Sequence, residues 1–143
     1  MRVVERAVLS DGLRQQWIEA CRQRLPHEAC GVIHGSREGN LLRIDGFSPV
    51  RNAAAAPARA FFFDPAAWVR VWYEAKRTGK PIAGVFHSHP DGTAQPSLTD
   101  TIHRLNWGTY WIVGMAREGV EIAGYLPDED APRGWRPIRL EIV

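Results

Sequence analysis

Residues 82–100 read IAGVFHSHPDGTAQPSLTD, and the character of the chain changes twice within them. Residues 82–87 form a nearly continuous apolar run, which is typical of a strand buried in the centre of a sheet. A polar loop bounded by Pro90 and Pro96 follows, and Ser97 then begins a short helix that we expect to end near Leu105. The stretch therefore predicts a strand, a loop and a helix, around which the other elements are arranged.

The residues on either side of this unit predict a sheet with helices packed against it. Apolar runs between turn residues predict strands at 1–9, 30–35, 41–50, 60–63, 109–114, 119–126 and 136–142, with loops at 52–59 and 127–134. Ser10 or Asp11 can cap a helix that Pro26 ends. Asp64 can cap a second helix that ends at Gly79. The mixture of strands and helices indicates the α/β class.

Five aromatic residues stand close together at the start of the second helix. Trp68 and Trp72 are one helical turn apart, and we expect both to pack in the core. Phe61, Phe62 and Phe63 fall in the preceding strand, whose side chains alternate between faces, so they cannot all point inward. At least one of the three is exposed or lies on a rim, and we expect it to border a substrate groove.

Length and composition exclude several classes of protein. The 143 residues predict one domain, 1–143, and the net charge of +2 is spread without a dense basic segment, so neither nucleic acid nor a membrane surface is an expected partner. Cys21 and Cys30 are too few for a disulfide framework. The start of the chain carries no long apolar segment, which predicts a cytoplasmic protein. The sequence carries no indication of its oligomeric state.

The candidate metal ligands stand where the central strand ends. His87 and His89 are two residues apart, so their imidazoles point to the same side of a strand and can bind one metal ion together. Asp100 lies one turn into the following helix and can supply an oxygen. Three protein ligands leave the fourth tetrahedral position of Zn²⁺ open to water, which distinguishes a catalytic site from a structural one.

Each part of this pattern has a simpler interpretation when it is considered alone. A His-x-His pair is more often two ordinary histidines, and Ser97 with Asp100 also matches a helix capping box. Capping and metal binding do not exclude each other. The combination of a buried strand ending in His-x-His, a tight polar loop and Ser-x-x-Asp rarely arises by chance.

The combined pattern resembles the JAMM (MPN+) zinc metallopeptidases. That family carries His-x-His, seven residues and then Ser-x-x-Asp, and residues 90–96 supply the seven. Its upstream Pro-x-Glu-x-Cys-Gly motif is matched by residues 26–31, PHEACG, which contain Glu28. Asn52 and the Asp64-Pro65 helix start also stand where stand-alone bacterial members have them. The resemblance covers roughly residues 26–114.

The resemblance implies a fold and a reaction. The fold would be cytidine-deaminase-like, with a curved central mixed sheet flanked by helices. His87, His89 and Asp100 would bind one catalytic Zn²⁺, which activates a water molecule, while Glu28 transfers the proton as general base. Ser97 would donate to the carbonyl oxygen as charge develops on it. The implied partner is the C-terminal Gly-Gly tail of a ubiquitin-like sulfur-carrier protein.

Two other functions fit parts of the pattern. The first is a non-catalytic MPN-type module that binds ubiquitin-like tails, and the complete ligand set together with Glu28 favours the peptidase over it. The second is a His-x-His phosphoesterase on a barrel, which typically needs about 250 residues and does not fit this length. Deaminase chemistry is not implied either, because the His-x-Glu and Pro-Cys-x-x-Cys ligands are missing.

Overall fold

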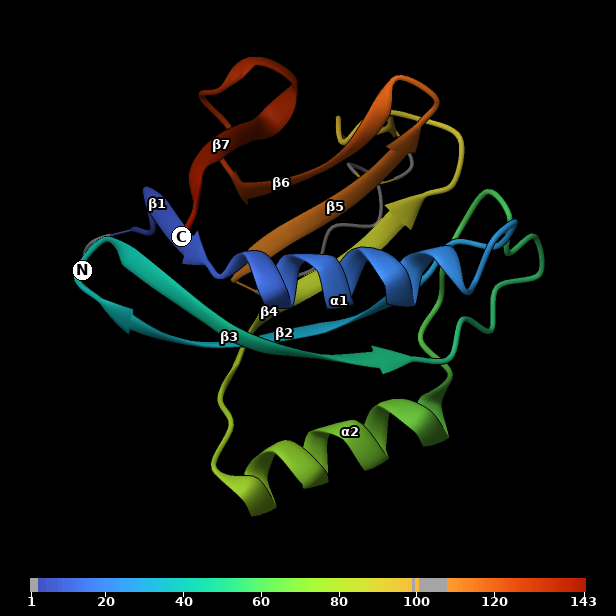
Figure 1. The fold of residues 1–143 in the computed structure, drawn as a ribbon, viewed down its shortest axis with the longest axis horizontal. Coiled ribbons are helices and arrows are strands. Elements are labelled where there is room, and N and C mark those ends of the chain that lie inside the picture. The colour runs from blue at the N-terminus through green and yellow to red at the C-terminus, as the bar shows by residue number, and fades with distance from the viewer. Residues whose placement is uncertain (1–2, 99, 101–107) are drawn as a thin grey trace.

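The computed structural model describes residues 3–98, 100 and 108–143 (Figure 1). Its elements within these ranges are β1 (Arg6–Leu9), α1 (Asp11–Arg22), β2 (Cys30–Glu38), β3 (Leu41–Val50), α2 (Pro65–Thr78), β4 (Ile82–His89), β5 (Thr109–Ala116), β6 (Gly119–Pro127), the single 3₁₀ turn η1 (Pro132–Gly134) and β7 (Trp135–Ile142). The α/β class and the mixed sheet predicted from the sequence are confirmed.

The strands close into a barrel in the order β1-β3-β2-β4-β5-β6-β7. The short strand β1 closes it, because β1 pairs in parallel with β3 on one side and with β7 on the other. Pairing is also parallel between β4 and β5 and antiparallel between the other neighbours. The sequence did not show this closure, because β1 is only four residues long. The deaminase-like sheet implied by the resemblance stays a prediction.

Helix α1 lies across the inside of the curved sheet, whereas α2 lies outside it below β2 and β3 (Figure 1). The Ser10 hydroxyl caps α1 by accepting from the Leu13 N–H at 3.1 Å. Trp17 on α1 is fully buried, and its ring meets Phe86 edge-on at 5.4 Å between centroids. Phe47 and Trp111 each lie 6.3 Å from the Trp17 ring, so three strands converge on this one side chain.

Several predicted boundaries differ from the structure. Helix α1 ends at Arg22, before Pro26, and β4 continues through His89. The strand predicted at 60–63 is wrong, because only Phe63 forms an isolated bridge, to Asn52. The helix predicted from 97 to 105 lies largely outside the described residues.

The predicted burial of Trp72 is also wrong. Trp72 is 38% exposed, and Trp68 is half-buried. Helix α2 lies on the outside of the sheet, and of its residues only Ala67 and Ala75 are buried (Figure 1). The Trp72 ring instead lies beneath the Lys76 ammonium, 4.8 Å from the ring centroid, which is a cation–π contact at the surface.

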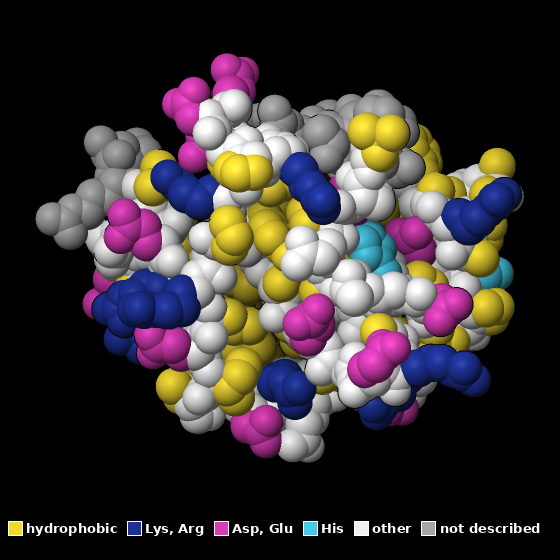
Figure 2. Space-filling model, turned by 90° about the horizontal axis from the view of Figure 1, so that it is seen from above, with side chains coloured by type: hydrophobic (Ala, Val, Ile, Leu, Met, Phe, Trp, Pro, Cys, Tyr) yellow, Lys and Arg dark blue, Asp and Glu magenta, His cyan; other side chains and the backbone are white. Residues whose placement is uncertain are grey.

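The surface carries both signs of charge. On the face shown in Figure 2, Lys and Arg side chains alternate with Asp and Glu and do not gather into one patch. Within the described residues, no helix has the length and apolar character needed to cross a bilayer.

Replacing Trp17 tests the central packing. Trp17→Ala should lower the free energy of unfolding by about 3–5 kcal/mol, because it leaves a cavity between three strands. Trp17→Phe should cost less, since the buried Trp17 Nε1 finds no hydrogen-bond partner among the described residues. Urea unfolding of the metal-free protein measures both. Tyr73→Ala, at a site 63% exposed, is the control, and equal losses for Trp17→Ala and Tyr73→Ala would contradict this account.

Candidate metal centre

Three candidate ligands converge at the carboxyl end of β4. The Nε2 atoms of His87 and His89 lie 3.1 Å apart. The Asp100 carboxylate spans both rings, with Oδ1 at 3.0 Å from His87 Nε2 and Oδ2 at 3.3 Å from His89 Nε2. These residues form a group that can hold a metal ion, with one ligand atom from each and all of the ligand atoms within 4.8 Å of one another.

The spacing of these atoms fits a tetrahedral ion. Bonds of roughly 2.0–2.1 Å at tetrahedral angles place neighbouring ligand atoms about 3.3 Å apart. The two Nε2 atoms, 3.1 Å apart, lie close to this value, and each has a different oxygen of the Asp100 carboxylate within 3.3 Å. Two imidazole nitrogens and one carboxylate oxygen are also a ligand set that zinc commonly takes in catalytic sites.

Asp100 has a second role in the local structure. Its Oδ2 accepts from the Ser97 backbone N–H at 2.7 Å, and the Ser97 Oγ accepts from the Asp100 N–H at 3.3 Å. These reciprocal bonds are the capping box that the sequence also allowed. The backbone bond at Ser97 therefore holds the Asp100 carboxylate in place beside the two imidazoles.

Asp100 and His89 each stabilise the charged form of the other. Burial raises the pKa of the Asp100 carboxyl, but hydrogen bonds with His87 and His89, the charge of His87 and the Ser97 N–H outweigh it and hold that pKa well below its usual range. Burial lowers the pKa of His89. Its hydrogen bonds with Asp100 and the Thr93 carbonyl, together with the negative charges of Asp100 and Glu28, outweigh burial and raise that pKa. The site therefore favours an anionic Asp100 carboxylate and a protonated His89.

Glu28 reaches this group from the start of β2. It is 7% exposed, and burial raises its pKa, while attraction to His87 and His89 lowers it and repulsion from Asp100 raises it further. The charges of all three candidate ligands therefore act on the Glu28 carboxylate. A buried carboxylate with a raised pKa is suited to accept a proton and to release it.

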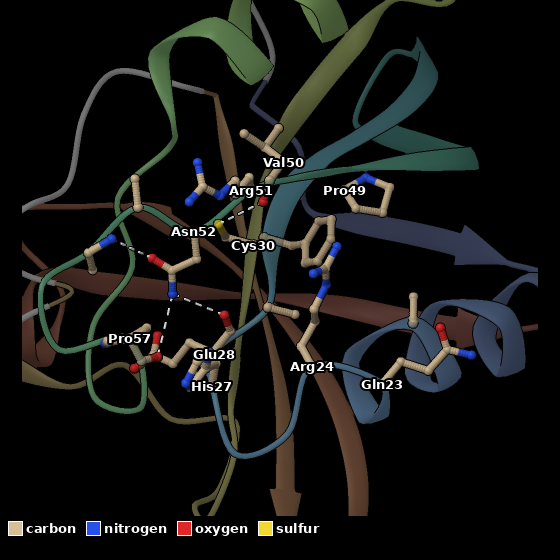
Figure 3. A pocket seen from close by; sticks show the side chains of 15 residues that line it. Gln23, Arg24, His27, Glu28, Cys30, Pro49, Val50, Arg51, Asn52 and Pro57 are labelled. Atoms are coloured by element: carbon tan, nitrogen blue, oxygen red, sulfur yellow. Dashed lines mark hydrogen bonds between the residues drawn. The ribbon is translucent and has the colours of Figure 1, made fainter.

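Asn52 holds the backbone around Glu28 (Figure 3). Its Nδ2 donates to the carbonyl oxygens of Glu28 and Ala60, both at 3.0 Å, and lies 3.4 Å from that of Pro57. Its Oδ1 accepts from the N–H groups of Ala54 and Phe62. One side chain thus ties the loop after β3 to the residue that carries the candidate base.

Ser88 provides a second link between the base and the histidines, and the sequence analysis did not identify it. The Ser88 Oγ accepts from the Ala29 N–H at 2.8 Å, and the Ser88 N–H donates to the Ala29 oxygen at 2.9 Å. Ser88 is fully buried on the opposite face from its two neighbours. Its position between two histidines in a strand was the available signal, since its side chain must point away from theirs.

The three phenylalanines occupy different environments. The Phe61 ring stacks on His87, with 4.7 Å between centroids and 19° between planes, so it borders the metal centre. Phe63 packs between Phe61 and Trp68. Phe62 is 60% exposed, so one of the three does face outward as predicted, although the strand on which that prediction rested is not formed. The expectation that one borders a groove becomes a proposal for Phe61.

A pocket of about 540 Å³ opens beside Glu28, and Arg24 and Cys30 line it (Figure 3). The pKa of the Cys30 thiol is raised to about 12, first by burial and then by the charge of Glu28, against a lowering by Arg24. Burial raises the pKa of Cys21 to about 12 as well. Neither thiol is ionised at neutral pH, so neither is suited to act as a nucleophile.

Comparison with known proteins finds several relatives. Residues 10–126 match the family model described as prokaryotic homologs of the JAB domain. The chain is 34% identical over 85 residues to a desampylase from Haloferax volcanii, a match that covers 59% of each protein. It is 28% identical over 117 residues to a probable TtuB-protein conjugate cleaving protease from Thermus thermophilus, covering 82% of this chain and 74% of that protein.

A solved structure shows the same fold. A protein from Desulfitobacterium hafniense matches with a TM-score of 0.83 at 24% sequence identity, over 96% of this chain and 92% of the other. The sequence match to the Haloferax desampylase, by contrast, spans less than two thirds of that protein.

Replacing the buried acid tests its electrostatic cost. Because the pKa of Glu28 is higher in the folded than in the unfolded chain, its ionised form reduces stability at neutral pH, and the reduction disappears as pH falls below the usual Glu range. Glu28→Gln should therefore raise the melting temperature of the metal-free protein at neutral pH, with a difference that shrinks in acid. Glu129→Gln, in an exposed loop, is the matched control. A lower melting temperature for Glu28→Gln at neutral pH would refute the argument.

Proposed function

The chain belongs to the family of prokaryotic homologues of the JAB domain, the JAMM family that its motifs resemble, and from this we propose that it is a zinc-dependent peptidase. Its substrate would be the C-terminal tail of a ubiquitin-like or sulfur-carrier protein, cut after Gly-Gly. The observation that carries the proposal is the convergence of His87, His89 and Asp100 beside the buried carboxylate of Glu28.

The proposed ligands are His87, His89 and Asp100. A zinc ion bound by them supplies Lewis acidity and lowers the pKa of a coordinated water toward neutrality. The close approach of the two imidazoles and the Asp100 carboxylate and the low pKa of that carboxyl support this assignment. Three protein ligands leave one position open, as hydrolysis requires.

Glu28 is the proposed general base. Its side chain is not one of the three converging ligands, and its raised pKa suits a group that takes a proton from water and delivers it to the leaving amine. Two side chains hold the peptide group between Glu28 and Ala29. Asn52 donates to its carbonyl oxygen, and the Ser88 hydroxyl accepts from its N–H, which keeps Glu28 aligned with the histidines.

Ser97 is the proposed donor to the carbonyl oxygen of the scissile bond. Its hydroxyl accepts from the Asp100 N–H, and a hydroxyl can accept and donate at the same time. The two capping-box hydrogen bonds fix the distance between Ser97 and Asp100, so the proposed donor is held close to one of the proposed metal ligands. A single donor of this kind contributes about 10²–10³-fold to the rate.

The proposed substrate follows from the relatives and from the walls of the site. The Haloferax relative is named a desampylase and the Thermus relative a probable TtuB-protein conjugate cleaving protease. The Phe61 ring stacks on His87 and forms one wall beside the proposed metal centre. Glycine has no side chain and lets a backbone approach closely, which favours a Gly-Gly tail at this position.

Variants of the ligand and the base should separate metal binding from chemistry. Asp100→Ala should lose most bound zinc, whereas Glu28→Gln should keep one zinc per chain and lose about 10²–10⁴-fold in kcat. Zinc content by mass spectrometry and turnover of a carrier–peptide fusion measure the two effects. Because the Asp100 carboxylate also accepts from the Ser97 N–H, Asp100→Asn is a control that keeps an acceptor for that group.

Each outcome has a separate meaning. Full zinc occupancy in Asp100→Ala would remove Asp100 from the ligand set. Near-normal turnover in Glu28→Gln would remove Glu28 as base. A wild-type chain that binds zinc and a carrier tail but cleaves nothing would favour the alternative of a non-catalytic module.

Substrate tails test the proposed specificity. A small ubiquitin-like carrier ending in Gly-Gly-Xaa should be cleaved after the second glycine, and the Ala-Ala form should be cleaved much more slowly, because a methyl group would meet the wall formed by Phe61. Mass spectrometry of the products measures both, with casein as a general protein control. Equal rates for both tails, or rapid digestion of casein, would refute the glycine preference while leaving the peptidase proposal intact.

A further inference from the structure

We propose that Glu121 and Tyr125 on β6 are positioning residues that set the orientation of the His89 ring. They do so by holding Ala94 in the loop that follows β4, and we call these two residues with Ala94 the Ala94 clamp. The inference rests on the proposed metal site, because it concerns how one of its ligands is presented. Neither residue touches the three converging ligand atoms.

The first step concerns the proton on His89. The Nδ1 of His89 lies 2.7 Å from the carbonyl oxygen of Thr93. A carbonyl oxygen can only accept a hydrogen bond, so Nδ1 must carry the proton. In the neutral ring, Nε2 then holds the lone pair, and Nε2 is the atom that faces His87 and Asp100. The Asp100 carboxylate, 3.3 Å from Nε2, favours the opposite tautomer, so the shorter contact with the Thr93 carbonyl is the one that favours the tautomer able to bind a metal.

The second step concerns what holds that carbonyl. The next residue, Ala94, is 1% exposed and is bonded from β6 through both of its backbone groups. Its N–H donates to the Glu121 Oε1 at 3.2 Å, and its carbonyl oxygen accepts from the Tyr125 hydroxyl at 2.6 Å. The loop position that faces His89 is thus fixed by side chains from a strand far along the chain.

The peptide group between Thr93 and Ala94 joins the two contacts. Its carbonyl oxygen accepts from His89, and its N–H donates to Glu121. The result is a chain of carboxylate, amide and imidazole, in which each hydrogen bond polarises the next. Metal-binding histidines commonly donate their second N–H to a carboxylate or a carbonyl. Here the carbonyl is itself polarised by a carboxylate on its far side.

The strand register places these parts in one line. His89 on β4 pairs with Gly114 on β5, and Gly114 pairs with Glu121 on β6. The loop crosses over the glycine between them. A Cβ at position 114 would lie 2.4 Å from the Ala94 nitrogen and 2.5 Å from the Thr93 carbonyl carbon. Only a residue without a side chain lets the loop reach both His89 and β6.

Tyr125 is itself held firmly. It is 6% exposed and packs edge-on against the Trp135 ring, 6.3 Å between centroids, in a cluster that also includes Ala94 and Ile112. Its hydroxyl therefore has few alternative positions. A rigid support of this kind is what a ligand needs if its orientation is to be set before the metal arrives.

Two variants disrupt the clamp by different means. Tyr125→Phe removes one hydrogen bond, and Gly114→Ala displaces the loop without removing a polar group. Tyr73→Phe on α2 and Gly12→Ala on α1 are matched controls, because Tyr73 is 63% exposed and a Cβ at position 12 meets nothing within 4 Å. Both clamp variants should bind Zn²⁺ about 10–100-fold more weakly in chelator competition, and both controls should match the wild type.

A measurement on the metal-free protein tests the same idea without activity. At alkaline pH, where imidazoles are neutral, nitrogen-detected NMR should show the wild-type His89 ring protonated at Nδ1. In Tyr125→Phe and Gly114→Ala the two tautomers should be mixed, with His89 assigned by its loss in His89→Gln. Glu121→Ala should weaken zinc binding more than Glu121→Gln, which keeps an acceptor for the Ala94 N–H.

The outcomes distinguish this inference from the proposed function. Clamp variants that stay folded by circular dichroism and keep both wild-type zinc affinity and a single His89 tautomer would overturn the clamp. If a clamp variant fails to fold, the two Glu121 variants decide, and equal wild-type affinity in both overturns it. A wild-type protein that binds no zinc would instead refute the proposed metal site, while the tautomer measurement would still test the clamp.

Discussion

The pairing of β4 on both of its edges is the constraint on which the site depends. β2 runs antiparallel along one edge and β5 runs parallel along the other, so the backbone is held up to His89. A strand fixed in this way determines the direction of every side chain on it. His87 and His89 therefore point to one side, while Ser88 points to the other and bonds the residue next to Glu28. The pairing of β2 with β4 therefore places Glu28, which stands two residues before β2, near the two histidines at the end of β4.

The loop after β4 adds what the strand cannot supply. Backbone groups at Thr93 and Ser97 fix the His89 ring and the Asp100 carboxylate through short hydrogen bonds. These backbone bonds add to the direct contacts between Asp100 and the two imidazoles. The cap of a helix and the proposed coordination of an ion use the same carboxylate, which makes local folding and binding parts of one arrangement.

Much of this could be predicted from the sequence, since the information was local. The apolar run of β4, the His-x-His spacing and the caps of α1 and α2 depend on residues close together in the chain. Closure of the barrel was not predictable, because it depends on a four-residue strand that pairs with two distant partners. The contacts of Ala94 with β6 were not predictable either, because they join residues far apart in the chain. The surface position of Trp72 was missed because helical periodicity assigned it to the core. Pattern reports which face of an element is apolar, but not whether another element covers it.

Closure by β1 also has a consequence for synthesis of the protein. Arg6 and Arg139 pair with each other, so the barrel cannot be completed until β7 has left the ribosome. Until then, β6 and β1 present unpaired strand edges, which are sites of association between nascent chains. Contacts between such distant residues also slow folding. The protein should therefore depend on chaperones during translation more than a helical bundle of the same length.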